Sequence, residues 1–330
     1  MPPQISLSEE AVDHVSCDAL VIGVSSDGNG ISLAGRDAAV DASMDGQVSA
    51  YLREVDFKAK LGEVAIVPTL GRLPAREIAV VGLGDSSEPS AATLRRAAGA
   101  AVRRLSERSV VASTMHAAVD PEAGTEAAAE GFLLGSYRFT AYKSDPHPSK
   151  IQHVYLLGKG SDGALERAHA ASEATALARD LTNEPASTLT PDALARRARE
   201  IADVNGLECT TLDERELEAK GFGGLITVGK GSDEPPRLIR LRYAPQGARG
   251  KVAIVGKGVT YDSGGLSIKD AKSMETMKTD MAGAAAVVGA MSALGRLGAR
   301  IEVHAYLPST ENMPGPSAIK PGDVIKHYGG

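Results

Sequence analysis

The sequence predicts an α/β protein with two domains, and three observations carry this prediction. Short apolar runs alternate with helical patterns, as they do where helices cover a parallel or mixed sheet. The chain has 330 residues, enough for two domains of about 150 residues each. Hydrophobic residues make up 43% and charged residues 24% of the chain, as in ordinary globular proteins. We expect an N-terminal α/β domain with a mixed sheet over 1–160, a linker helix over 161–182 and a second α/β domain over 183–330.

In the first half, apolar runs predict strands at 19–24, 63–68, 77–82, 110–116 and 151–157. A helix is expected over 90–105, because Leu94, Ala98, Val102 and Leu105 recur on one face. An alanine-rich helix is expected over 125–134. The segment 142–150 is polar and holds two prolines, which predicts an exposed loop.

The second half begins with a long alanine-rich helix expected over 163–181. Thr190 is a candidate N-cap for the next helix, with Pro191 at its first position. A further helix is expected over 283–294, and strands are expected over 208–212, 237–243, 251–255 and 300–307. Residues 320–330 predict a strand entering a Gly-Gly hairpin turn with no second strand after it. We therefore expect the chain to be a fragment or a truncated product.

Composition and charge exclude several classes of protein. The net charge of −6 does not suit nucleic-acid binding, which needs a concentrated basic face. Cys17 and Cys209 are the two cysteines and form no C-x-x-C motif, which favours a reducing cytoplasm. The first residues lack the pattern of a signal peptide, and no apolar stretch approaches the roughly 20 residues of a membrane span.

The most informative segment is the glycine-rich run 256–265, which follows the apolar strand at 251–255. It carries Lys257 and Asp262, and Lys269 and Asp280 follow soon after. Glycines let the backbone turn sharply, so these four ionisable groups can converge. Carboxylates suit divalent cations, and one carboxylate can bridge two of them. The sequence does not fit a Walker loop, because Gly258 follows Lys257 where that motif needs Ser or Thr.

The residue types indicate separate roles. A lysine ligates a metal only as the neutral amine, which a nearby dication favours at Lys257. Lys269 can instead stay cationic and face a developing oxyanion. Asp280 precedes the helix expected over 283–294, whose N-terminal amides we expect to hold its side chain.

The ordered blocks of this region resemble the leucyl (cytosol) aminopeptidases, a family of two-metal exopeptidases. They are Gly256-Lys257-Gly258, Asp262-Ser263-Gly264-Gly265, Ser267-Ile268-Lys269 and Met277-Lys278-Thr279-Asp280-Met281-Ala282-Gly283. The resemblance extends over about 170–330, through Asn183-Glu184-Pro185-Ala186, Leu189-Thr190-Pro191, Gly223-Gly224-Leu225, Gly229-Lys230-Gly231-Ser232, Glu311-Asn312-Met313-Pro314 and Lys320-Pro321-Gly322-Asp323.

The resemblance implies a role for each matching residue. Lys257 and Asp280 would ligate one metal, and Asp262 would bridge both. Lys269 would polarise the scissile carbonyl, and Met277 would line the pocket for the first side chain of the peptide. In the family a water bridging the metals, Mn or Zn, is the nucleophile. The implied activity is removal of N-terminal residues, Leu preferred, from peptides in the cytoplasm by a homo-hexamer.

One part of the family pattern is missing. Its last motif, Asn-Thr-Asp-Ala-Glu-Gly-Arg, supplies further metal ligands, and it is absent from this sequence. We therefore expect an incomplete catalytic domain over 183–330, and we expect the 330-residue chain to be inactive by itself and to assemble poorly.

Other motifs have ordinary structural explanations beside the functional ones. Gly82-Leu83-Gly84 suggests a dinucleotide fingerprint, but Ser87 breaks the pattern and a tight turn is favoured. His304 is a candidate base, and a structural histidine is favoured. Ser263 lacks a nucleophile elbow, so a backbone-shaping role is favoured. The arginines of the helix over 90–105 are expected on a solvated face; they are Arg95, Arg96, Arg103 and Arg104.

Two alternatives from other classes stay open. The chain could be a non-catalytic DNA-binding or accessory module, since some members of the family act in this way. It could also be a nucleotide-binding α/β protein, an idea that rests only on its glycine-rich turns. Steeply salt-dependent DNA binding would indicate the first, and binding of ADP-ribose or NAD would indicate the second.

Overall fold

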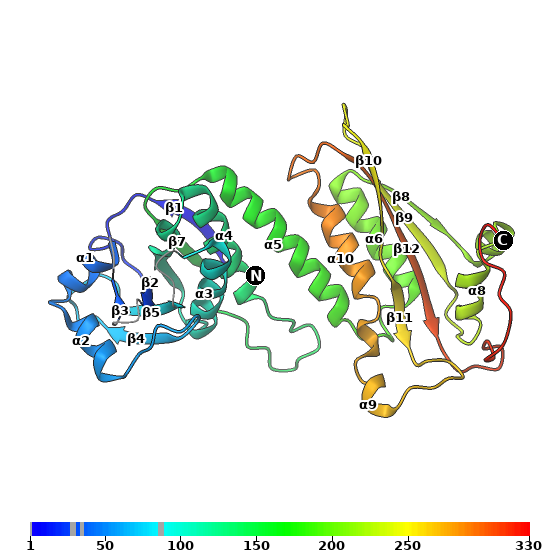
Figure 1. Cartoon of the computed structure of the whole chain (residues 1–330), viewed down its shortest axis with the longest axis horizontal. Coiled ribbons are helices and arrows are strands. Elements are labelled where there is room, and N and C mark those ends of the chain that lie inside the picture. Colours follow the sequence, from blue (N-terminus) through cyan, green and yellow to red (C-terminus); the bar gives the residue numbers. More distant parts are fainter. Residues whose placement is uncertain (1, 27–30, 34–35, 85–88) are drawn as a thin grey trace. The chain divides into compact units, whose positions relative to one another are not determined.

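The computed structural model describes residues 2–26, 31–33, 36–84 and 89–330. The described chain divides into two compact units, Met1–Ser172 and Glu173–Gly330. Each unit holds one sheet with helices (Figure 1). The predicted α/β class, with a mixed sheet in the N-terminal part, is confirmed.

The first unit is built on a mixed sheet of order β1-β7-β6-β2-β5-β4, with β3 beside β2. The pairs along the path from β1 to β5 are parallel, and β4 and β3 are antiparallel to their neighbours. The strands are β1 (Gln4–Ser8), β2 (Ala19–Ser26), β3 (Ile31–Ser32), β4 (Val64–Pro68), β5 (Glu77–Gly84), β6 (Val110–Ser113) and β7 (His153–Leu157). Its helices are α1 (Arg36–Ser43), α2 (Gln47–Glu54), α3 (Ala91–Arg104), the short 3-10 helix η1 (Met115–Ala118) and α4 (Pro121–Ser136).

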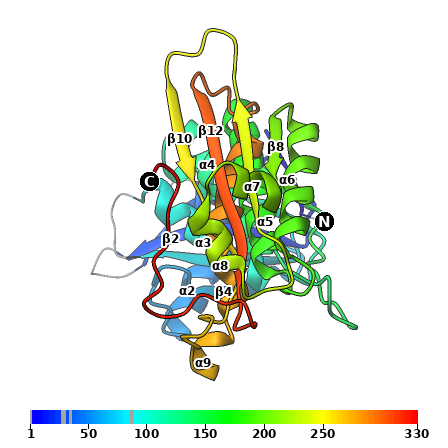
Figure 2. The same cartoon turned by 90° about the vertical axis from the view of Figure 1, so that its right-hand side faces the viewer.

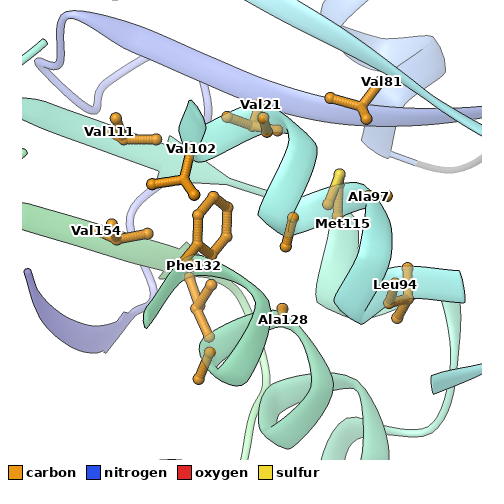
Figure 3. Packing of buried hydrophobic residues seen from close by; sticks show 14 of the residues in the cluster. Val21, Val81, Leu94, Ala97, Val102, Val111, Met115, Ala128, Phe132 and Val154 are labelled. Carbon is orange, nitrogen blue, oxygen red and sulfur yellow. The ribbon is translucent and has the colours of Figure 1, made fainter. Parts of the chain in front are cut away.

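Both faces of this sheet are buried, because alternate residues of its strands enter different cores. Val21 of β2 packs with Phe132 of α4 and Val102 of α3 (Figure 3). Leu20 and Ile22 of the same strand enter the core beneath α1 and α2. The predicted helices over 90–105 and 125–134 are confirmed, and the second is longer than expected because Asp120 caps it at the Ala123 amide.

The second unit contains the end of α5 (Asp162–Asn183) and a sheet of order β10-β12-β9-β8. Its strands are β8 (Glu208–Leu212), β9 (Arg237–Tyr243), β10 (Lys251–Val255), β11 (Gly258–Asp262) and β12 (Glu302–Asn312). Its other helices are α6 (Pro191–Asn205), α7 (Glu214–Ala219), α8 (Gly223–Gly229), α9 (Ala271–Met274), the 3-10 helix η2 (Met277–Thr279) and α10 (Ala282–Ala293). In Figure 1, α6 and α10 cover one face of the sheet and α8 lies on the other.

Local signals in this unit were predicted correctly. Thr190 Oγ1 accepts a hydrogen bond from the Ala193 amide at 3.3 Å and caps α6, with Pro191 at its first position. The long helix expected over 163–181 is α5, and the helix expected over 283–294 is α10.

The strand predicted over 320–330 is wrong. These residues form turns, and β12 is the last strand in the described part of the chain. The segment instead lies against α8, where the carbonyl of Lys326 packs on Gly223 so closely that a side chain there would clash. A strand forms only where a ladder partner accepts its backbone hydrogen bonds, and this segment has none among the described strands.

The strand β12 organises the end of the sheet at which the glycine-rich loop lies. β10 pairs in parallel with its first half and β11 pairs in parallel with its second half, along the same edge. The chain therefore leaves the ladder between Val255 and Gly258 and rejoins it, so that Gly256 and Lys257 form a break in one edge of the sheet.

Candidate metal and substrate site

The break between β10 and β11 presents Lys257. Its carbonyl accepts a hydrogen bond from the Ala284 amide in the first turn of α10 at 2.9 Å. The neighbouring position needs glycine, since a Cβ on Gly256 would lie 2.6 Å from the Gly283 carbonyl oxygen. This close approach fixes the Lys257 backbone against the start of the helix.

The side chain of Lys257 reaches Asp280, with Nζ 2.5 Å from Oδ2. The lysine side chain is 57% exposed and the aspartate side chain 19% exposed, so this pair lies at the surface. Asp280 follows η2 and precedes α10, as the sequence predicts. The expectation that helix amides hold its carboxylate is wrong: the Ala284 amide donates to the Lys257 carbonyl, and the carboxylate binds the Lys257 ammonium instead.

Asp262 ends β11 and has three donors around its carboxylate. The Gly264 amide and the Asn312 side-chain amide donate to Oδ1 at 3.0 and 2.8 Å, and Lys269 Nζ lies 2.8 Å from Oδ2. Burial alone would raise the pKa of the Asp262 carboxyl, but the hydrogen bonds from Lys269, Asn312 and Gly264 outweigh it and lower this pKa to about 2. The carboxylate is thus held in its charged form.

Lys269 lies at the centre of the loop. Its Nζ contacts the Asp262 carboxylate and lies 2.8 Å from Met277 Sδ. Its amide donates to the Ser263 carbonyl at 2.9 Å, which folds the loop back on the end of β11. Gly264 and Gly265 allow this turn because both have positive φ, +90° and +64°.

The structure thus joins the five predicted site residues in two sets, Lys257 with Asp280, and Lys269 with Asp262 and Met277. The 3-10 helix η2, which carries Met277 and precedes Asp280, packs against β11. Within the described ranges there is no group of three or more His, Cys, Asp or Glu side chains that could hold a metal ion. The donors offered are two carboxylates and one amine, a set that suits hard or borderline divalent cations.

Asn312 was not predicted as a site residue. It lies at the end of β12, beside Asp262 in the parallel ladder with β11. The sequence contained a signal, because Glu311-Asn312-Met313-Pro314 is one of the family-like blocks, but this block was expected only as a loop. Ser263 is also fixed by Asn312, since its hydroxyl donates to the Asn312 carbonyl at 2.7 Å. This contact agrees with the backbone-shaping role favoured for Ser263.

His304 is a structural residue, as favoured from the sequence. Its Nδ1 is 3.0 Å from Arg240 Nη2 and its Nε2 is 2.8 Å from a Glu302 oxygen. On α3, Arg95 forms an ion pair with Glu130. Ser87, on which the dinucleotide reading fails, lies outside the described residues.

None of the described helices has the length and apolarity that crossing a membrane requires.

Two family models match the chain. The one described as the cytosol aminopeptidase family, catalytic domain, matches residues 176–330, and the one described as the N-terminal domain of the same family matches residues 21–146. The probable cytosol aminopeptidase of Rhodococcus opacus is 41% identical over 99% of this chain and 66% of its own length. That of Streptomyces coelicolor is 40% identical over 99% of this chain and 68% of its own length. The chain therefore spans about two thirds of the length of these curated relatives.

Solved structures give the same fold. The bottromycin maturation enzyme BotP in complex with Mn is 38% identical, with a TM-score of 0.80 over 94% of this chain and 63% of that one. A mutant of tomato leucine aminopeptidase is 28% identical, with a TM-score of 0.84 over 100% of this chain and 67% of that one.

Proposed function

Because the chain belongs to the cytosol aminopeptidase family, we propose that it carries part of a metal-dependent aminopeptidase that removes N-terminal residues, Leu preferred, from peptides. In this proposal Lys257, Asp262 and Asp280 hold two divalent ions, Mn or Zn. Lys269 is the catalytic residue and Met277 contacts the first side chain of the substrate.

The observation that carries the proposal is the position of Lys269 between Asp262 and Met277. In this position the Lys269 ammonium lies beside both the carboxylate of Asp262, a proposed metal ligand, and the apolar side chain of Met277. A peptide whose scissile carbonyl meets this ammonium would have its first side chain next to Met277. The ammonium would stabilise negative charge as it develops on the carbonyl oxygen.

The donor chemistry fits divalent ions. Asp262 is held charged by its neighbours, and its second oxygen, Oδ2, lies 2.8 Å from the ammonium of Lys269. Lys257 would bind as the neutral amine once a cation replaces its proton, releasing its ion pair with Asp280. When bound, the ions supply Lewis acidity and an activated water. Asn312 and the Gly264 amide keep the Asp262 carboxylate in one orientation.

Two carboxylates and one amine give little charge compensation for two dications. We therefore propose that the 330-residue chain hydrolyses peptides poorly by itself. A protein that joins it to the remaining third found in its relatives would be active, as a homo-hexamer in the cytoplasm.

The test is hydrolysis of leucine p-nitroanilide with added Mn. The chain is assayed alone and fused to the corresponding C-terminal third of the Rhodococcus opacus relative. We expect Mn-dependent release of p-nitroaniline by the fusion and little by the chain alone. A folded, Mn-loaded fusion without peptidase activity would contradict the aminopeptidase proposal. Robust activity of the chain alone would contradict the expectation that its own ligands are too few.

A further inference from the structure

The 3-10 helix η2 carries Met277 but is too short to hold its own position. Its residues, Met277 to Thr279, are each partly exposed. Its amide hydrogen bonds run from Thr279 to the Thr276 carbonyl at 2.9 Å and from Asp280 to the Met277 carbonyl at 3.3 Å. The hydrogen-bond geometry of a 3-10 turn is poor. Contacts with other elements must therefore place the side chains of η2.

The chain before η2 gives this support only weakly, whereas the chain after it is firmly placed. Residues 270–273 and 275–276 are exposed, and Figure 2 shows α9, which they surround, beyond the end of the strands. On the other side, Met281 is fully buried in the core that also contains Leu181 of α5. Met277 thus lies between an exposed segment and a buried residue.

Lys278 ties η2 to a distant part of the second unit. Its Nζ lies 2.6 Å from the carbonyl oxygen of Asn183, across 95 residues of sequence. Asn183 is the last residue of α5. Lys257 and Lys269 pair with carboxylates, whereas Lys278 donates to the backbone of a helix end.

The Asn183 carbonyl can accept this bond because α5 ends there. The last four carbonyls of a helix have no partner within the helix. Pro185 follows two residues later and has no N–H with which α5 could continue. An ammonium at this end satisfies a free carbonyl and interacts favourably with the helix dipole. A hydrogen bond from a charged donor is also stronger than one between neutral groups.

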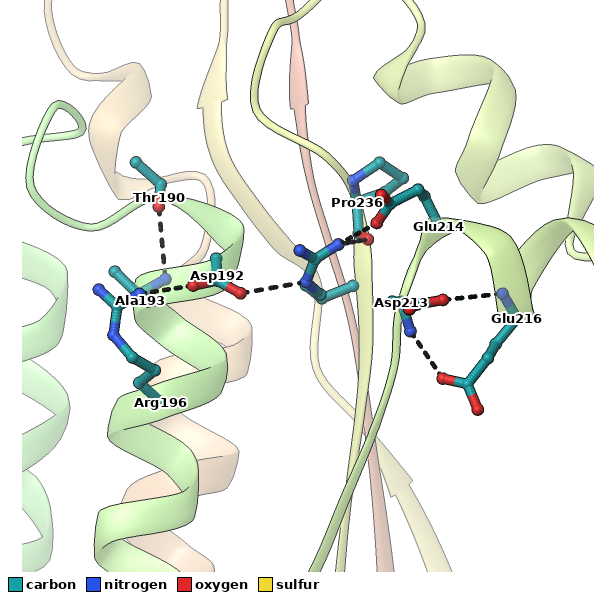
Figure 4. Close-up of polar contacts among 9 residues, drawn as sticks. Thr190, Asp192, Ala193, Arg196, Asp213, Glu214, Glu216 and Pro236 are labelled. Carbon is teal, nitrogen blue, oxygen red and sulfur yellow. Dashed lines mark hydrogen bonds and ion pairs between the residues drawn. The ribbon is translucent and has the colours of Figure 1, made fainter.

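The end of α5 is itself well fixed. Leu181 and Leu189, on either side of Asn183, are buried in the core of this unit. The next helix, α6, begins soon after, and Asp192 in its first turn binds Arg237 of β9 at 3.2 Å, a contact drawn as a dashed line in Figure 4. The Asn183 carbonyl is therefore a firm point of attachment for Lys278.

We propose that Lys278 is a positioning residue, which holds η2 against the end of α5 and so keeps Met277 beside Lys269. This inference rests on the proposed function, in which Met277 contacts the first side chain of the substrate. With three residues per turn, neighbouring side chains of a 3-10 helix point in different directions. Lys278 can therefore bind Asn183 while Met277 faces the loop. In this role Lys278 sets the selectivity for the first side chain through Met277.

The first test needs no enzymatic activity. The 330-residue chain is isotope-labelled at its methionine methyl groups, and the Met277 signal is identified by its absence in Met277→Leu. We expect a nuclear Overhauser effect between this methyl group and the Lys269 side chain. It should be lost in Lys278→Leu and kept in Lys278→Arg, which retains donors for the Asn183 carbonyl. Lys272→Leu, in the exposed helix α9, is the control and should also keep it.

The second test measures turnover by the fusion protein. Leucine p-nitroanilide has a side chain to pack on Met277, and glycine p-nitroanilide has none. Lys278→Leu should raise KM for the leucine substrate about tenfold, as loss of an apolar contact does, with kcat unchanged. For the glycine substrate kcat/KM should not change, and neither should the affinity for Mn. Lys278→Arg should restore the KM of the unaltered fusion.

Several outcomes would overturn the proposal. They are absence of the Overhauser effect from the unaltered chain, its persistence in a folded Lys278→Leu, and an equal loss of activity on both substrates, which would make Lys278 a residue that only stabilises the unit. If the fusion hydrolyses neither substrate, the proposed function fails, and the Overhauser effect alone decides whether Lys278 positions Met277. If Lys278→Leu loses its cooperative thermal transition, Lys278→Gln takes its place in both tests, because its amide falls one atom short of the ammonium.

Discussion

The side-chain amide of Asn312 donates a hydrogen bond of 2.8 Å to Oδ1 of Asp262, across 50 residues of sequence. The contact exists because β11 and β12 run in parallel and end together, with Asp262 paired to Asn312. The same asparagine accepts the Ser263 hydroxyl at its carbonyl oxygen. One residue of β12 therefore holds both the orientation of a proposed metal ligand and the backbone that follows it.

Replacing Asn312 should weaken metal binding without removing a ligand. Asn312→Ala removes one of the three donors that hold the Asp262 carboxylate, and loss of such a supporting hydrogen bond typically lowers metal affinity about tenfold. Titration of Mn with electron paramagnetic resonance detection of the free ion measures the change. Asn205→Ala is the matched control, because the Asn205 side chain donates to the Ile201 carbonyl within α6. Equal Mn affinity of Asn312→Ala and the unaltered chain would show that Asn312 does not support the site.

Gly256 should be essential for packing of the loop on α10. A Cβ at this position would lie 2.6 Å from the Gly283 carbonyl oxygen and 2.7 Å from Ala284 Cα, which are backbone atoms that cannot turn aside. Gly256→Ala should lower the free energy of unfolding of the second unit by about 1–3 kcal/mol. The control is Gly250→Ala, where a Cβ meets nothing within 4 Å. Urea unfolding measures both, and equal stability of the two variants would refute the close approach.

Lys269 should affect turnover more than metal binding. In the fusion protein, Lys269→Met would remove the ammonium that we propose faces the scissile carbonyl, and loss of such a group costs about 10²–10³ in kcat. Lys272→Met removes an exposed lysine of α9 and should leave kcat unchanged. Mn affinity is measured on the same samples. A fall in Mn affinity with unchanged kcat at saturating Mn would assign Lys269 to the metal rather than to the substrate.

Asp37 should make the first unit less stable as the pH rises. Burial raises the pKa of its carboxyl to about 6, against the lowering effect of hydrogen bonds from Thr114 and the Gly23 backbone. The unfolded chain releases this proton near pH ~4. Between these values the native state binds more protons, so the free energy of unfolding falls as the pH rises from about 4 through 6.

Asp37→Asn should remove this dependence and stabilise the first unit by up to about 2–3 kcal/mol at pH 7. Hydrogen exchange of the β2 and α4 amides between pH 4 and 8 measures it. The exposed Asp13→Asn serves as the control. A pH slope that persists in Asp37→Asn would assign it to another group.

Local signals predicted much of this structure, and contacts distant in sequence explain what was missed. The cap of α6 at Thr190 and Pro191 lies within four residues, so it could be read directly. Asn312 could not be assigned, because its role depends on the parallel register of β11 with β12. The position of Asp280 before α10 was predicted correctly, but the partner of its carboxylate was not. The Ala284 amide of the helix donates to the Lys257 carbonyl instead. The strand over 320–330 was predicted from the residues of that segment alone, whereas a strand forms only where a neighbouring strand pairs with it.

The central claim is that Lys257, Asp262 and Asp280 bind the same divalent ions. Crystals of the fusion protein grown with Mn and measured at the manganese absorption edge test it most directly. We predict anomalous peaks about 2.0–2.2 Å from oxygens of Asp262 and Asp280, with the Lys257 Nζ withdrawn from Asp280 and bound to one ion. Manganese bound elsewhere, with the Lys257–Asp280 ion pair intact, would contradict the account.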